Sequence, residues 1–362
     1  MTGRKRARDL GLVVGELPTG PSNAITDVPD VAVGHTTLIE GEGPLRPGYG
    51  PVRTGVTVIL PYGGNLFREK VRAAVHTING FGKALGFEEV RELGVIEGPI
   101  ALTNTLNVGL VADALVQYMV RHNPDIGIRT HSLNVVVGET NDGYLNDLQG
   151  RHVRAEHVWA ALESARTGGV AEGNVGAGTG TTCFGWKGGI GTSSRVTPRE
   201  SGGWTVGALV QANFGEPGHL FILGRPVGRP RPDGLLASPP GDNGSIMIVL
   251  ATDAPLSERQ LGRLCKRAAA GLARLGSVYG HGSGDFVIAF STAFRIPDPP
   301  PALTASSAAV IDEASAMRGL FPAVADCVEE SVLNALCMAQ TMAGRDGHVR
   351  YALPIAEFLA RL

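Results

Sequence analysis

A serine hydroxyl directly follows a glycine where residues 242–245 are Asp-Asn-Gly-Ser, just before the apolar stretch Ile-Met-Ile-Val-Leu-Ala. Gly244 has no side chain, so the Ser245 hydroxyl can approach the Gly244 carbonyl closely. Attack there would convert the amide to an ester, and water would release Ser245 as a new amino terminus. A free α-amine has a pKa of about 7.7–8.0, which suits a general base at neutral pH, and a serine hydroxyl needs such a base. The junction therefore permits self-cleavage followed by serine catalysis.

The same four residues have a simpler interpretation. Asn-Gly is among the strongest turn signals, and serine often begins a strand. Taken alone, the tetrapeptide is most simply a turn. The segment before it, residues 225–244, is rich in proline and glycine, which disfavours helix and sheet. We expect an exposed linker there, and exposed segments of this kind are where chains are cut.

The elements that must position this junction follow from the apolar pattern. Short runs rich in β-branched residues predict strands, and apolar residues at helical spacing predict helices. The strands cluster and the helices cluster, which favours layered sheets covered by helices over a doubly wound βαβ chain. The expected strands are 56–60, 133–137, 205–211, 219–223, 246–251 and 286–290, and the expected helices are 66–78, 108–121, 157–165, 258–275, 305–317 and 324–342.

Eight segments between residues 23 and 347 resemble, in one order, the β-aminopeptidase / L-aminopeptidase–D-esterase family. They are NAITDVPDVAVGHTTL, HTINGFGKALG, LTNTLNVG, VVVGETNDGYLND, GHLFILGRPVG, GDNGSIMIVLATDAPL, GSGDFVIAFST and ESVLNALCMAQTMAGRDG. The resemblance implies an α/β (α+β) fold, a four-layer αββα sandwich of the ornithine acetyltransferase / aminopeptidase type, in one domain spanning 1–362. It also implies autocatalytic cleavage before Ser245, giving a large chain, 1–244, and a small chain, 245–362, that stay together.

Two further residues of the nucleophile site are implied by the resemblance. Ser283 and Asp285 precede an expected strand, and alternation along an extended segment places both side chains on one face. In the family, a serine and an acid at this spacing orient and polarise the nucleophile and its amine. The family carries Glu at the acid position, whereas this chain has the shorter Asp285, which leaves the direct contact open. Without the resemblance, a Gly-Ser-Gly turn with a solvated aspartate is the simpler interpretation.

Four more side chains are candidates by resemblance or by chemistry. Asn213 follows an apolar strand and resembles a family residue that donates to an oxyanion; Tyr144 resembles one that lends a hydroxyl to the same site. A peptidase acting on free amino ends needs a carboxylate to pair with the substrate ammonium, for which Glu139 is the first choice and Asp142 the second. A turn asparagine, a surface tyrosine and capping acids are the corresponding structural alternatives.

The chain contains 51 glycines, which indicates many tight turns and close backbone approaches. Residues 168–191 are especially rich in glycine but are followed by no helix, and no GxxxxGK[ST] motif is present, so a nucleotide loop is not supported. We expect a glycine-rich wall beside the active site, with Asn174 as a further substrate-binding candidate.

The composition excludes several other classes of protein. The net charge of −2, with acids and bases interspersed, gives no basic face for nucleic acid and no polybasic membrane patch. No apolar run reaches transmembrane length, and the apolar run at 10–14 is too short for a signal peptide. The nine histidines and four cysteines show no metal-ligand spacing. We expect a cytoplasmic enzyme with no metal, cofactor, membrane or nucleic-acid partner.

The expected activity is release of amino-terminal residues, α or β and L or D, from short peptides, amides and esters through an acyl-Ser245 intermediate. An acyltransferase like ornithine acetyltransferase is the nearest alternative, although that group typically uses threonine as nucleophile. A non-enzymatic ligand-binding module is a third possibility. The resemblance further implies a homo-oligomer of cleaved pairs, while chirality and oligomer number stay open.

Overall fold

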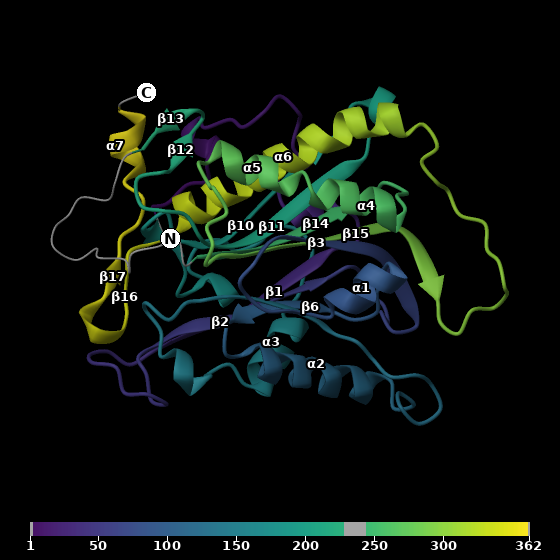
Figure 1. The fold of residues 1–362 in the computed structure, drawn as a ribbon, viewed down its shortest axis with the longest axis horizontal. Helices are drawn as coiled ribbons and strands as arrows, with labels where there is room; N and C mark the ends of the chain where they lie inside the picture. The colour runs from purple at the N-terminus through teal and green to yellow at the C-terminus, as the bar shows by residue number, and fades with distance from the viewer. Residues whose placement is uncertain (1–2, 228–243, 361–362) are drawn as a thin grey trace.

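The computed structural model describes residues 3–227 and 244–360, in which two β-sheets lie face to face (Figure 1). The five-stranded sheet has the order β1 (Ala32–Glu40), β2 (Val52–Leu60), β6 (Ile100–Asn104), β7 (Val136–Thr140), β4 (Ala84–Leu85). The six-stranded sheet has the order β10 (Gly189–Val196), β11 (Thr205–Asn213), β14 (Ser245–Thr252), β15 (Gly284–Pro297), β3 (Glu69–Gly80), β5 (Val95–Ile96).

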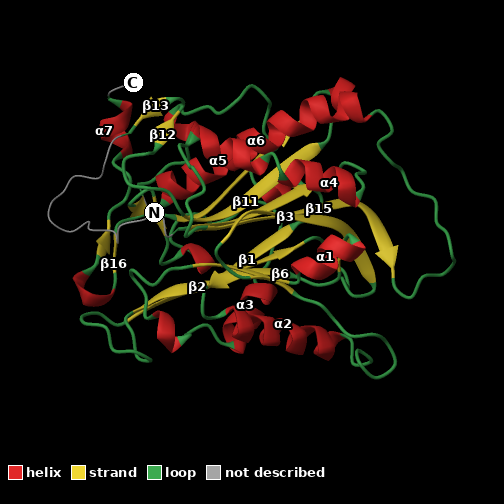
Figure 2. Ribbon diagram, viewed as in Figure 1, coloured by secondary structure: helices red, strands yellow, loops and turns green. Residues whose placement is uncertain are grey.

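Helices cover the outer face of each sheet (Figure 2). The helices α2 (Val108–His122) and α3 (Ala155–Glu163) lie on the five-stranded sheet. The helices α4 (Glu258–Cys265), α5 (Ala268–Arg274) and α6 (Glu313–Met338) lie on the six-stranded sheet. The short helix α1 (Phe87–Leu93) packs on β3 and β5. Shorter elements are β8 (Thr182–Cys183), β9 (Trp186–Lys187), β12 (Phe221–Ile222), β13 (Arg225–Pro226), β16 (Met342–Ala343), β17 (Val349–Arg350) and α7 (Ile355–Leu359). The expected four-layer αββα architecture is confirmed.

Apolar side chains fill each of the three spaces between these layers, and β14 shows how one strand serves two of them. Its residues alternate in direction, as strand residues do. Ile246 and Ile248 pack toward α4, α5 and α6, whereas Met247 and Val249 pack between the two sheets. Because both faces are covered, the strand is buried along its whole length and is apolar between its end residues Ser245 and Thr252. Ser245, the first residue of this strand, is therefore enclosed by the neighbouring strands β11 and β15 and by the layers on both faces of the sheet.

The expected strands all occur, although β7 begins three residues later than predicted, and α2 and α3 lie within two residues of their expected bounds. The helix expected at 66–78 is wrong, because those residues form most of β3. The helix expected at 305–317 is wrong before Glu313, and the pattern at 258–275 forms two helices, α4 and α5. The 225–244 linker begins as the short strand β13, paired with β12; its residues 228–243 lie outside the described residues.

In the described parts of the chain, no helix combines the length and the hydropathy that a membrane span requires.

Candidate active site

Ser245 is the first residue of β14 and is 5% exposed. It lies opposite Asn213, the last residue of β11, in an antiparallel pair, and opposite Gly284, the first residue of β15, in a parallel pair. Neighbouring strands of a sheet lie about 5 Å apart. The sheet itself therefore brings together the predicted nucleophile, the predicted oxyanion donor and the segment that carries Ser283 and Asp285.

The contacts around Ser245 are those of the continuous chain, in which Gly244 precedes Ser245. The Ser245 hydroxyl donates a hydrogen bond to the Gly244 carbonyl oxygen at 2.7 Å, and the Gly284 N–H donates to the same oxygen at 3.2 Å. A Cβ at Gly244 would lie 2.5 Å from Cα of Phe214 and 2.7 Å from the carbonyl oxygen of Asn213. Only glycine fits without displacing this backbone, and its absent side chain lets the hydroxyl lie against the carbonyl.

Ser283 and Asp285 lie on one face of the chain, as alternation predicts. The Ser283 hydroxyl donates to Asp285 Oδ1 at 2.7 Å, and both residues are 1% exposed. The shorter acid therefore reaches the serine, and a solvated aspartate is excluded. The Ser283 N–H donates to the carbonyl of Gly280, which closes the turn that leads into β15.

The side-chain amide of Asn213 has a defined orientation. Its Oδ1 accepts a hydrogen bond from the backbone N–H of Thr182 at 2.8 Å. The amide oxygen is thus occupied, and the NH₂ group is the end that can donate to a ligand. This is the end that an oxyanion requires.

Glu139 on β7 lies across the gap between the two sheets from β15. Its Oε1 accepts the Lys83 N–H at 3.0 Å, and the Thr105 hydroxyl donates to its Oε2. Burial raises the pKa of Glu139, against these hydrogen bonds, which favour the charged form. Gly82 separates it from the nucleophile strands: a Cβ there would lie 3.2 Å from Glu139 Oε1 and 3.3 Å from Gly284 Cα. Glu139 thus borders the nucleophile site.

Asp142 lies deeper than Glu139. It is 1% exposed, accepts the Asn146 amide at Oδ1 at 2.9 Å, and lies beneath Gly180, whose Cβ would approach Asp142 Cβ to 2.9 Å. Burial raises the pKa of Asp142 to about 7. Of the two candidate acids, Glu139 is the one placed beside Gly82 and Gly284.

Tyr144 is half-buried and held by two residues from the C-terminal hairpin of β16 and β17. The His348 ring stacks on the Tyr144 ring at 4.4 Å, and the Arg350 guanidinium lies 3.4 Å from the Tyr144 ring centroid. Arg350 is only 2% exposed and also donates to the Thr182 hydroxyl at 3.0 Å. No local sequence motif marks Arg350, because Tyr144 and Thr182 lie more than 160 residues before it.

Asn174 makes a reciprocal pair of hydrogen bonds with the backbone of Gln340: its amide donates to the Gln340 carbonyl at 2.9 Å and accepts the Gln340 N–H at 3.0 Å. Both ends of this amide are thus engaged. The structure connects Asn174 to the segment after α6, and its role in substrate binding stays a prediction.

The glycine-rich segment packs closely, as expected. A Cβ at Gly178 would lie 2.3 Å from the backbone nitrogen of Ile190, and one at Gly188 would lie 2.3 Å from the Ala212 carbonyl oxygen. The fully buried Lys187 ammonium donates to the carbonyls of Gly178, Thr181 and Gly188 at 2.8–3.0 Å. Burial lowers the pKa of Lys187 to about 7. Thr182, which belongs to this glycine-rich segment, donates its backbone N–H to Asn213 Oδ1 and so connects the segment to the active site.

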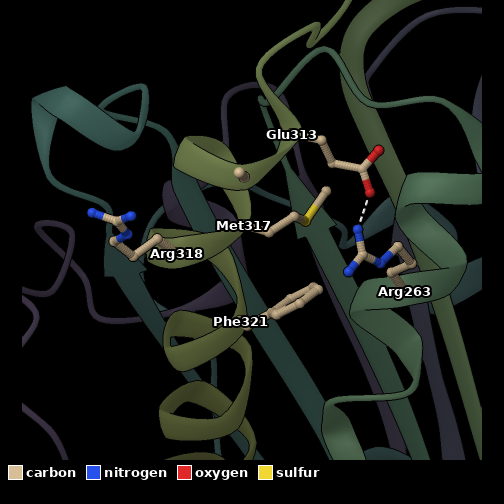
Figure 3. A pocket seen from close by; sticks show the side chains of 6 residues that line it. Arg263, Glu313, Met317, Arg318 and Phe321 are labelled. Atoms are coloured by element: carbon tan, nitrogen blue, oxygen red, sulfur yellow. Dashed lines mark hydrogen bonds and ion pairs between the residues drawn. The ribbon is translucent and has the colours of Figure 1, made fainter.

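A surface pocket of about 420 Å³ lies elsewhere, between α4 and the first turns of α6 (Figure 3). Arg263 and Glu313 form an ion pair at its rim, beside Met317 and Phe321. It is open to solvent, and none of the predicted site residues lines it. Within residues 3–227 and 244–360, no group of three or more His, Cys, Asp or Glu side chains is arranged to hold a metal ion.

An αββα sandwich in which a serine begins a central buried strand, with its hydroxyl against the preceding carbonyl, defines a hydrolase of the N-terminal-nucleophile type. The model of peptidase family S58 matches residues 23–350. A β-peptidyl aminopeptidase, BapA, from Sphingosinicella microcystinivorans is 43% identical over 371 residues, which cover 99% of this chain and 91% of the relative. The chain belongs to peptidase family S58.

Two solved structures agree with this assignment. A β-aminopeptidase from Burkholderia sp. is 44% identical, with a TM-score of 0.88 and coverage of 98% of both chains. The L-aminopeptidase D-Ala-esterase/amidase from Ochrobactrum anthropi, described as a prototype for the serine aminopeptidases and a variant of the Ntn hydrolase fold, is 41% identical, also with a TM-score of 0.88 and 98% coverage of both chains. This chain is thus a hydrolase of the serine aminopeptidase class, and the relatives give no support to the acyltransferase alternative.

Proposed function

We propose that the chain cleaves itself between Gly244 and Ser245, and that the freed Ser245 then hydrolyses short substrates that carry a free amino end. The single observation that supports this most strongly is the position of the Ser245 hydroxyl, 2.7 Å from the Gly244 carbonyl oxygen at the start of a buried central strand.

Self-cleavage begins when Ser245 Oγ attacks the Gly244 carbonyl carbon. The bond from that carbon to the Ser245 nitrogen breaks, the nitrogen takes up a proton, and Gly244 is left as an ester on Ser245. Water hydrolyses the ester to give a Gly244 carboxylate and a free Ser245 hydroxyl. The Gly284 N–H, which donates to the Gly244 carbonyl at 3.2 Å, is placed to stabilise the negative charge that develops on that oxygen.

The same donor serves the substrate. Removal of Gly244 from its place beside β15 leaves the Gly284 N–H for the substrate carbonyl, and the NH₂ group of Asn213 supplies a second donor from the opposite strand. The Ser245 amine takes the hydroxyl proton as Oγ attacks and gives it to the leaving group. Ser283, held by Asp285, orients that amine, and the carboxylate stabilises the ammonium form.

Glu139 binds the ammonium group of the substrate, which explains a requirement for a free amino end. Its carboxylate lies beside Gly82 and Gly284, next to the acyl position. The relatives described above are a β-peptidyl aminopeptidase and an L-aminopeptidase that is also a D-Ala esterase and amidase. We therefore propose short peptides, amides and esters of small α- or β-amino acids as substrates. We also expect a homo-oligomer of cleaved pairs, which light scattering would measure.

A matched pair of substrates tests this function. Alanine amide and N-acetylalanine amide differ only in the free amine, so the enzyme should hydrolyse the first and leave the second intact. Ser245→Ala should hydrolyse neither. Equal turnover of both amides would contradict the role of the amino end, and an active Ser245→Ala protein would exclude Ser245 as the nucleophile. D-alanine amide and β-alanine amide, measured in the same assay, identify the preferred substrate class.

A further inference from the structure

Arg350 is an almost completely buried arginine at the end of β17, in the segment that follows α6. An arginine at 2% exposure needs partners, because a buried unpaired charge is strongly unfavourable. Two of its partners lie in distant parts of the chain: the Tyr144 ring is 3.4 Å from the guanidinium carbon, and the Thr182 hydroxyl accepts from Nε at 3.0 Å. A hydrogen bond also joins Arg350 to Tyr144. Arg350 therefore fixes two segments relative to each other.

Thr182 carries this restraint into the active site. Its hydroxyl accepts from Arg350, while its backbone N–H donates to Asn213 Oδ1 at 2.8 Å. That second hydrogen bond decides which way the NH₂ group of Asn213 points. An unbroken series of contacts thus runs from Arg350 through Thr182 to the amide opposite Ser245.

We propose that Arg350 and the Thr182 hydroxyl are positioning residues that set the orientation of the Asn213 amide for the acyl-transfer step. This inference rests on the proposed role of Asn213 as an oxyanion donor. Arg350 lies in the part of the chain after Ser245, whereas Tyr144, Thr182 and Asn213 lie before it. After the proposed cleavage, the small chain therefore completes a site whose oxyanion donor belongs to the large chain.

The geometry favours positioning over packing alone. Arg350 reaches Thr182 with a hydrogen bond of defined direction, and Thr182 offers its hydroxyl to one partner and its N–H to the other. The planar guanidinium can lie against the Tyr144 ring while its edge donates to the hydroxyl, a combination that lysine cannot reproduce. His348, stacked on the same tyrosine ring, lies with its Nδ1 2.8 Å from the Tyr144 carbonyl oxygen, and this contact further restrains the segment.

The experiment compares Thr182→Val with Thr182→Ser, each alone and combined with Asn213→Ala. Valine keeps the shape and the backbone N–H but removes the hydroxyl, whereas serine keeps the hydroxyl. The values of kcat and KM are measured with alanine amide on protein that mass spectrometry shows to be fully cleaved. Arg350→Lys is a second, independent variant, also made alone and combined with Asn213→Ala. The melting temperature of every variant is recorded.

We expect Thr182→Val to lower kcat by about tenfold to a hundredfold with little change in KM, since a misplacement of about 1 Å can reduce a rate by a hundredfold. Thr182→Ser should stay near the wild-type kcat, and Arg350→Lys should resemble Thr182→Val. With Asn213→Ala already present, neither change should lower kcat further.

The positioning role would be overturned if Thr182→Val and Arg350→Lys lowered kcat as much in the Asn213→Ala enzyme as in the wild type. It would also be overturned if both variants alone kept the wild-type kcat. Either result would leave the proposed hydrolase intact. A wild-type kcat in Asn213→Ala alone would overturn both this inference and the proposed oxyanion donor.

Discussion

Glu139→Gln separates the charge of the proposed ammonium site from its shape. The carbonyl oxygen of the substituted side chain can still accept the Lys83 N–H, and its NH₂ group can still contact the Thr105 hydroxyl, so both hydrogen bonds at this position can persist, whereas the ion pair with the half-exposed Lys83 ammonium at 3.9 Å is lost. What disappears is the negative charge that would pair with the substrate ammonium.

The expected loss follows from the burial of that charge. Removing one partner of a buried ion pair destabilises it by about 3–5 kcal/mol, and about 1.4 kcal/mol corresponds to a factor of ten at 25 °C. The lower end of that range corresponds to a fall in kcat/KM of about a hundredfold, which is the loss we expect. Asp142→Asn is the matched control, because Asp142 is sealed beneath Gly180; its kcat/KM should stay within a few-fold of the wild type.

The pH dependence gives a second signature of the same group. The pKa of Glu139 is raised by burial, so its charged form is lost at a higher pH than for an ordinary glutamate. The kcat/KM of the wild type should therefore fall as the pH drops through that raised value, and this acid limb should be absent in Glu139→Gln. A Glu139→Gln enzyme with wild-type kcat/KM and an unchanged acid limb would refute the assignment, and a large loss in Asp142→Asn alone would transfer the role to Asp142.

Three other variants test the oxyanion donor, the cleavage junction and the core. Asn213→Ala should lower kcat by about 10²–10³, as expected for one lost oxyanion donor, with normal folding by circular dichroism; normal turnover would remove Asn213 from the mechanism. Gly244→Ala should slow self-cleavage in a time course on denaturing gels, because the new methyl group would collide with backbone atoms of Asn213 and Phe214; cleavage at the wild-type rate would contradict the close approach. Glu330→Leu removes the carboxylate that pairs with the fully buried Arg195. It should therefore lower the free energy of unfolding by about 3–5 kcal/mol in urea titrations of the uncut protein. An unchanged free energy of unfolding would show that this ion pair adds nothing to stability.

The sequence predicted the central strands β11, β14 and β15 of the six-stranded sheet but missed β1 and β6 of the other sheet and the more polar β10. The strand β10 escaped notice because its residues Thr192, Ser193 and Arg195 look like loop residues. In the structure all three are buried and have partners: Thr192 donates to the Ala208 carbonyl on the neighbouring strand, while Ser193 donates to the Cys327 carbonyl and Arg195 pairs with Glu330, both on α6. A single sequence cannot show that a polar strand will be satisfied by a helix more than 100 residues later.

The helix predicted at 66–78 failed for a different reason. The apolar residues Val71, Ala74, Val75 and Ile78 recur at helical spacing, so the periodicity of this segment favours a helix. In the structure, β3 pairs with β15 through two register shifts and is covered by α4 on one side. Tertiary pairing decides its conformation.

The sequence could predict those site residues that lie at the ends of neighbouring strands. Ser245 and Asn213 each lie at the end of a recognisable apolar strand, and Ser283 and Asp285 lie at the start of another, so sheet pairing brings these strand ends together. Arg350 could not be predicted in this way, because its contacts with Tyr144 and Thr182 depend on where the chain after α6 returns to the sheet. The four-layer architecture, by contrast, came from the family resemblance and is confirmed.

Intact mass spectrometry of purified, active enzyme tests the central claim most directly. We predict two chains whose masses place the new amino terminus at Ser245, and a single inactive chain of full mass for Ser245→Ala. An active wild-type protein that remains one uncut chain, or a terminus at any other residue, would contradict the account.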